Sequence, residues 1–253
     1  MNRKPIFTTA LLLIMLSAPL SLFGQDFEMD GTVLVRYRGS ETNAAIPEGV
    51  TAIGKGAFLW CESLTSINIP ASVTSIGNYA FLGCSSLMSI TIPSGVISIE
   101  DSTFADCGSL ANITIPLSVT LIGQWAFTGC ESITSITIPP GVTSIGNYAF
   151  LECSNLVTVT FAAGSQLVTI GDSAFATCTS LTSITIPPNV AFIGNGAFFL
   201  CESLTSITIP PSVKSIGDSA FELCNNLKTA TVSKGTTIGS YAFPAGVRII
   251  YSD

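Results

Sequence analysis

A 23-residue repeat runs through most of the chain and constrains its fold more than any other feature. The eight cysteines stand at positions 61, 84, 107, 130, 153, 178, 201 and 224, so they lie 23 residues apart except for one interval of 25. The same apolar pattern returns around each cysteine, as in IPASVTSIGNYAFLGCSSLMSIT from Ile69 to Thr91. A fixed period of roughly 20–29 residues with this density of Ile and Leu is typical of a solenoid, in which each repeat forms one coil.

The residue order within one repeat predicts two extended segments per coil. Apolar and polar residues alternate from Ile67 to Ile69, which indicates a half-buried strand. Pro70 ends that strand because proline has no N–H to donate to a neighbouring strand. Residues 73–76 then form a second, shorter strand. No coil can bury its apolar side chains alone, so stacking of successive coils must supply the core.

The rest of the repeat predicts a corner and a short helical turn. Gly77 stands at a corner where we expect a positive φ. Residues 78–84 direct Ala80, Phe81 and Cys84 inward, at spacings that suit one turn of α- or 3₁₀-helix.

Two places depart from this pattern. Glu100 replaces the corner glycine in the third repeat, and we expect it to strain or reshape that corner. Segment 161–185 carries two extra residues, where AAGSQL replaces the usual short turn.

The ends of the chain differ from the repeats. Residues 1–24 have a basic start, Arg3 and Lys4, and an apolar stretch, and they are expected to be a cleavable signal peptide; a membrane anchor is the alternative. Residues 25–45 predict a hairpin that caps the first coil. Residues 46–231 hold eight repeats, and residues 232–253 a partial repeat and a C-terminal cap, because a solenoid must protect its open ends.

The composition excludes several classes of function. Cleavage after residue 24 leaves 7 basic against 16 acidic residues, a net charge of −9, so nucleic acid and membrane lipid are poor partners. The chain has no histidine, the side chain most used for acid–base catalysis and zinc binding. We therefore expect neither an enzyme nor a cofactor or metal.

The cysteines are expected to be buried free thiols. Each occupies the same interior position of its coil, so their side chains point in parallel, whereas a disulfide needs a χ₃ near ±90°. Disulfides between neighbouring coils and metal capture by parallel thiols are the alternatives; no C-x-x-C pair supports the second.

The outward positions of the longer strand are short polar residues, which suit a broad, weakly polar contact surface for a protein or a glycan. The column we consider a candidate ligand-binding site comprises Asn68, Thr91, Thr114, Thr137, Thr160, Thr185 and Thr208. A second reading is that Ser and Thr simply stack well on an exposed sheet. A third is an ice-binding threonine array.

Aromatic residues at the helical turn form a second candidate surface, on the opposite side of the coil. The candidates are Trp60, Tyr79, Trp125, Tyr148 and Phe199. Exposed aromatic residues favour contact with a protein partner.

The repeat resembles that of a known family, the BspA-type leucine-rich repeats of bacterial and protist surface proteins. The shared motif is I-P-x-x-V-T-S-I-G-x-x-A-F-x-x-C-x-x-L-T-S-I-T, matched from Ile46 to Thr231. The resemblance implies a leucine-rich-repeat-like, right-handed, curved β-solenoid with a concave parallel sheet and short helical turns on the convex side. It also implies a secreted or cell-surface protein.

The signal peptide and the repeat together predict an exported binding protein that adheres to host matrix proteins or other cells. Its expected partner is an extracellular protein or a glycan. A passive structural spacer in the cell envelope is the alternative. After signal cleavage no membrane insertion is expected, and the oligomeric state stays open.

Overall fold

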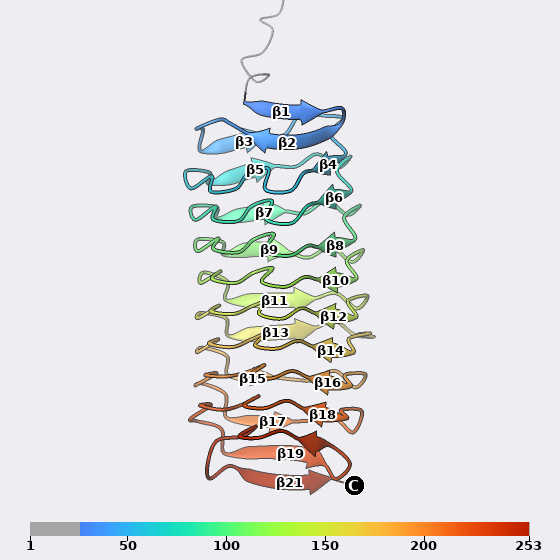
Figure 1. Ribbon diagram of the computed structural model, residues 1–253, viewed down its shortest axis with the longest axis vertical. Coiled ribbons are helices and arrows are strands. Elements are labelled where there is room, and N and C mark those ends of the chain that lie inside the picture. The colour runs from blue at the N-terminus through green and yellow to red at the C-terminus, as the bar shows by residue number, and fades with distance from the viewer. Residues whose placement is uncertain (1–25, 253) are drawn as a thin grey trace, which may run out of the picture.

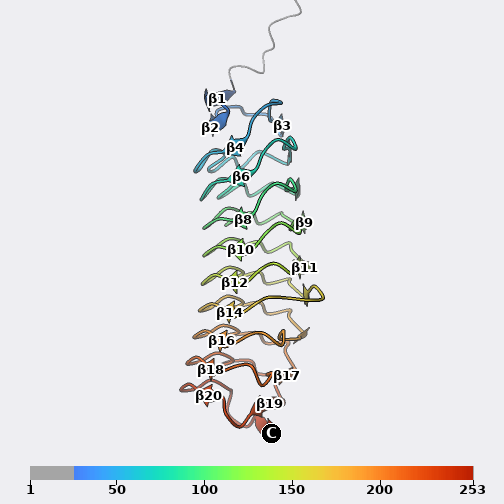
Figure 2. The ribbon, with the colours of Figure 1, turned by 90° about the vertical axis from the view of Figure 1, so that its right-hand side faces the viewer.

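The computed structural model describes residues 26–252 as one stack of similar coils (Figures 1 and 2). The predicted repeat solenoid is confirmed: the chain is a parallel β-solenoid of about 10 turns. The stack bends little in either view, so we name its two sheet faces by their strands rather than as concave and convex.

Each coil contributes one strand to the long-strand face and one to the short-strand face. The long-strand face consists of β3 (Asn43–Ala45), β5 (Ser66–Asn68), β7 (Ser89–Thr91), β9 (Asn112–Thr114), β11 (Ser135–Ile138), β13 (Thr158–Phe161), β15 (Ser183–Ile184), β17 (Ser206–Thr208), β19 (Thr229–Ser233) and β21 (Arg248–Ser252). The short-strand face consists of β4 (Ala52–Ile53), β6 (Ser75–Ile76), β8 (Ser98–Ile99), β10 (Leu121–Ile122), β12 (Ser144–Ile145), β14 (Thr169–Ile170), β16 (Phe192–Ile193), β18 (Ser215–Ile216) and β20 (Thr237–Ile238). Figure 2 shows the long strands along one edge of the stack and the turn segments along the opposite edge.

An antiparallel hairpin stands at the start of the stack. It joins β1 (Phe27–Asp30) to β2 (Val33–Tyr37), and β2 then pairs in parallel with β4. Phe27 and Tyr37 lie with their ring centroids 5.2 Å apart and cover the first coil.

Phenylalanine rings stacked on one another form the centre of the core. Neighbouring ring centroids are 5.0–5.5 Å apart and the planes are within 14° of parallel. The ladder comprises Phe58, Phe81, Phe104, Phe127, Phe150, Phe175, Phe198, Phe221 and Phe243. Because the same ring recurs at the same position of every coil, each coil buries the apolar face of the one before it.

The helical turn expected at residues 78–84 does not form, and the described residues contain no helix. The segment is a run of tight turns in which Tyr79 (φ 61°) and Gly83 (φ 74°) adopt left-handed conformations. Its backbone bonds the next coil, as when Phe81 N donates to Thr103 O at 2.9 Å. A helix would direct these N–H groups along its own axis, so bonding between coils replaces it.

The corner glycines serve a different purpose from the one expected. Gly77 does not have a positive φ; a Cβ added to it would lie 2.9 Å from Lys55 N in the preceding coil. At Gly146 the same atom would lie 2.6 Å from Gly123 C. Glycine is therefore required here because two backbones approach closely, not because of its conformational freedom.

Glu100 interrupts the short-strand sheet at this corner. From β8 onward the short strands form one sheet, and β4 and β6 belong to another; β6 and β8 do not pair. Gly123 N donates to Ile99 O at 2.7 Å, and Gly77 N to Ile53 O at 2.9 Å, but among residues 26–252 no such bond joins Glu100 to Ile76. Paired coils leave no space for a Cβ at this corner, so the backbone at Glu100 lies apart from the backbone at Gly77.

The predicted signal peptide, residues 1–24, lies outside the described residues. Over residues 26–252, no helix has the length and apolar character that a membrane span requires.

Candidate functional site

The long-strand face presents its short polar side chains in register. Thr91 pairs with Thr114, Thr137 with Thr160 and Thr208 with Thr231 in parallel ladders. All seven residues of the candidate column, from Asn68 to Thr208, are exposed. The isoleucines between the two polar columns point inward, as the period of two requires. The structure therefore brings these residues together on one uncharged surface.

That surface is divided into three blocks of paired strands, because β9 does not pair with β11 and β15 does not pair with β17. Thr114 closes the first block, and Thr208 opens the last. The polar face is thus less regular than its sequence pattern.

The aromatic candidates do not form one continuous row. Tyr79, Trp125 and Tyr148 share one position of the coil, but Ser102 occupies that position between the first two. Trp125 and Tyr148 stack with their ring centroids 5.3 Å apart and their planes 6° apart. Phe199 is half-buried at a different position of its turn.

The other two aromatic residues make separate local contacts near the start of the stack. The indole of Trp60, 56% exposed, lies directly over Gly83, where a Cβ would overlap it. The Lys55 ammonium lies 5.4 Å from the centroid of the Tyr79 ring, a cation–π contact. The side of the turns therefore offers small aromatic sites rather than a single patch.

The eight cysteines are free thiols, as predicted, and all but Cys61 are buried. The structure adds a role that the sequence did not suggest: Cys130 Sγ donates to the Phe104 carbonyl oxygen at 3.1 Å, and Cys153 Sγ to Phe127 O at 3.2 Å. Burial raises the pKa of the Cys107 and Cys153 thiols to about 12. Such thiols are structural groups rather than nucleophiles.

A ladder of side-chain amides and carboxylates, also missed at the level of sequence, joins the corners of later coils. Asn147 Oδ1 accepts from Asp172 N at 2.8 Å, Asp172 Oδ1 from Asn195 N at 2.7 Å, and Asn195 Oδ1 from Asp218 N at 2.8 Å. The available signal was the Asn or Asp that follows the corner glycine in four consecutive coils, from Gly146 to Gly217. These oxygens are already occupied by N–H donors, and no cluster suited to a metal ion occurs among residues 26–252.

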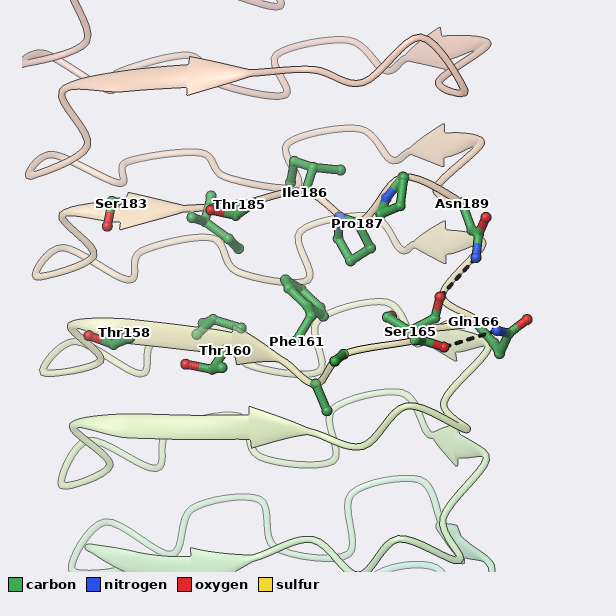
Figure 3. A pocket seen from close by; sticks show the side chains of 16 residues that line it. Thr158, Thr160, Phe161, Ser165, Gln166, Ser183, Thr185, Ile186, Pro187 and Asn189 are labelled. Atoms are coloured by element: carbon green, nitrogen blue, oxygen red, sulfur yellow. Dashed lines mark hydrogen bonds between the residues drawn. The ribbon is translucent and has the colours of Figure 1, made fainter.

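The AAGSQL insertion creates a groove on the long-strand face. It protrudes from the edge of the stack beside β13 (Figure 2). The groove has a volume of about 580 Å³ and lies between residues 158–166 and residues 183–189 (Figure 3). Thr160 and Thr185, two of the candidate residues, line it.

Comparison with known proteins identifies the repeat. The sequence model of the BspA type leucine rich repeat region matches residues 51–166 and 161–250, in six copies. The chain belongs to the BspA-type leucine-rich repeat family. No curated protein matches it.

Solved structures of bacterial leucine-rich repeat proteins share this architecture. A leucine-rich repeat protein from Bacteroides ovatus is 31% identical, with a TM-score of 0.64, over 88% of this chain and 66% of that one. A leucine rich cell surface protein from Faecalibacterium prausnitzii is 29% identical, with a TM-score of 0.68, over 90% of this chain and 74% of that one. The Treponema pallidum leucine rich repeat protein is 27% identical, with a TM-score of 0.63, over 81% and 89%. The BspA-type chain thus spans just under two thirds of the Bacteroides ovatus protein.

Proposed function

We propose that this BspA-type protein is an exported binding protein that attaches the cell to extracellular protein or glycan through its long-strand face. The observation that carries the proposal is the in-register surface of exposed Ser, Thr and Asn side chains, held by buried isoleucines. Such a surface is preorganised, so the protein loses little conformational entropy when a partner binds.

Catalysis has no place in this proposal. The sequence lacks histidine, and the interior thiols donate to backbone carbonyls instead of facing solvent. The chain has few charged residues, so contact through hydroxyl and amide groups is more consistent with its surface than electrostatic capture.

Two observations support an exported, cell-surface role. The Faecalibacterium prausnitzii protein is described as a cell surface protein, and residues 1–24 have the composition of a signal peptide. Detection of the protein in the culture medium or on intact cells, with an N-terminus near residue 25, tests the export step.

Binding of the purified protein to immobilised extracellular matrix proteins and glycans tests the main proposal. Saturable binding is expected, and Thr137→Arg on the long-strand face should abolish it because a long charged side chain covers the surface. Thr120→Arg, an exposed position next to the short-strand face, is the matched control and should bind as the original chain does. Equal binding by both variants would assign the contact to another face.

A passive spacer remains the second candidate, favoured by the uniformity of the coils. It predicts no saturable binding to any ligand and no effect of removing two internal coils. Ice binding is disfavoured, because the threonine array that it needs is interrupted between β9 and β11 and between β15 and β17.

A further inference from the structure

One coil departs from the repeat at three neighbouring points. Phe161 stands in register with Ile138, at a position where the other seven repeats between Ile46 and Ile209 have isoleucine. Ala162 replaces the proline that ends the long strand in most coils, and two extra residues follow. All three changes lie along the same groove.

These changes separate two adjacent coils at their ends. β13 pairs with β11 through to Phe161, but with β15 only at Thr158 and Val159. Beyond Val159 the chain follows the preceding coil, as Ala162 N donates to Ile138 O at 3.0 Å. The divergence opens the space of about 580 Å³ between the coils, a volume within the usual range for small-molecule sites.

A hydrogen bond connects the two walls of the groove at one end. Asn189 Nδ2 donates to Ser165 O at 2.8 Å and joins the two walls there (Figure 3). Gln166 Nε2 donates to Gly164 O at 2.9 Å and holds the inserted loop in place. This bond narrows one end and leaves the strand side as the wider entrance. The groove therefore suits the end of a short chain better than the middle of a long one.

The lining combines an apolar wall with neutral polar groups. The Phe161 ring is half-buried and points toward Ile186 and Pro187 (Figure 3). Thr160 and Thr185 carry hydroxyl groups on the strand side. None of the residues lining the groove has an ionisable side chain, so the site favours an uncharged ligand.

We propose that this groove binds the end of a neutral oligosaccharide, one or two sugar rings long. The C–H face of a sugar ring packs on an aromatic ring, and its hydroxyls exchange hydrogen bonds with threonine hydroxyls and side-chain amides. A proline-rich peptide would need a groove open at both ends and several aromatic ridges. The inference rests on the proposed binding function and assigns it a site and a ligand class.

Saturation-transfer NMR and calorimetry of the full chain with cellotriose, maltotriose, mannobiose and N-acetyllactosamine test the inference. At least one of these neutral sugars is expected to bind, and Phe161→Ile should weaken it by about tenfold because it restores the usual residue and removes the ring. Thr120→Val, at an exposed position next to the short-strand face and away from the groove, is the matched control and should leave the affinity unchanged. Raising the salt from 0.1 to 1 M should also have no effect, since no charge takes part.

Three results would overturn the inference. The first is that no sugar of the panel binds. The second is that a sugar binds equally well to the Phe161→Ile variant. The third is that a proline-rich peptide binds through Phe161 while no sugar binds. A different outcome would keep the proposed function and reject only this site. In that case no sugar binds, whereas a matrix protein binds in a way that Thr137→Arg abolishes and Phe161→Ile preserves. Circular dichroism of each variant confirms that it folds.

Discussion

Cys130 Sγ donates a 3.1 Å hydrogen bond to the carbonyl oxygen of Phe104, which belongs to the preceding coil. The same carbonyl accepts from Cys107 N within its own coil at 3.3 Å. Six other cysteines repeat the thiol bond, so the column links each coil to its neighbour. This explains why cysteine, rather than alanine, occupies a fully buried position that needs a small side chain.

Replacing Cys130 by alanine is expected to lower the free energy of unfolding by about 1–3 kcal/mol, from the lost hydrogen bond and the cavity left behind. Cys61→Ala is the control, because Cys61 is only half-buried at the first coil, and it should cost clearly less. Urea unfolding followed by circular dichroism measures both. Equal losses would show that the thiol bond contributes nothing.

Stability should fall at alkaline pH. The thiols of Cys107 and Cys153 have a pKa of about 12 in the folded chain, against an ordinary value of 9.0, because burial penalises the thiolate. A raised pKa favours the neutral form, so the stabilisation is complete below pH 9 and is lost as the pH rises from 9 toward 12. Each such thiol costs about 1.4 kcal/mol per pH unit in that window.

Urea unfolding at pH 8, 9 and 10 measures this dependence. Cys153→Ala should lose less stability between pH 9 and pH 10 than the original chain, because one titrating thiol is absent. A free energy of unfolding that stays constant from pH 8 to pH 10 would contradict the prediction.

Glu100→Gly should close the gap between β6 and β8. Removing the side chain allows the backbone of residue 100 to approach Gly77 and donate to Ile76 O, as Gly123 donates to Ile99. We expect a gain of about 0.5–2 kcal/mol in stability from the recovered backbone hydrogen bonds. Hydrogen exchange at residues 97 and 100 should slow at the same time.

Glu100→Ala separates the effect of charge from the effect of the Cβ atom. It keeps the Cβ, so it should leave hydrogen exchange at residue 100 fast. If alanine slows exchange as much as glycine does, then charge rather than close approach separates the two coils.

Gly83→Ala should displace the indole of Trp60. The added methyl group would overlap that ring, and Gly83 has a φ of 74°, where a Cβ costs about 1–2 kcal/mol. The expected result is lower stability together with a shift in the fluorescence of Trp60, measured in a Trp125→Phe background. Gly129→Ala, with a similar φ of 69° but no indole above it, is the control and should leave the fluorescence unchanged.

The 23-residue pattern is enough to specify the solenoid, the pairing of equivalent residues in successive coils and the buried thiols. A 23-residue period places Phe81 over Phe58 and Cys84 over Cys61 as soon as one coil stacks on the next. The polar column from Asn68 to Thr208 follows from the alternation within the long strand. These features depend only on which residues recur, and recurrence is visible in the sequence.

The contacts between neighbouring coils follow from the three-dimensional packing and not from the repeat pattern. The turns around Tyr79 bond to the next coil rather than to themselves, so no helix forms there. Gly77 is needed for close backbone approach and not for a positive φ, and Glu100 therefore opens the sheet. The groove beside Phe161 exists because two strands diverge. Each outcome depends on the distance between two backbones in space, which the sequence of one coil does not specify.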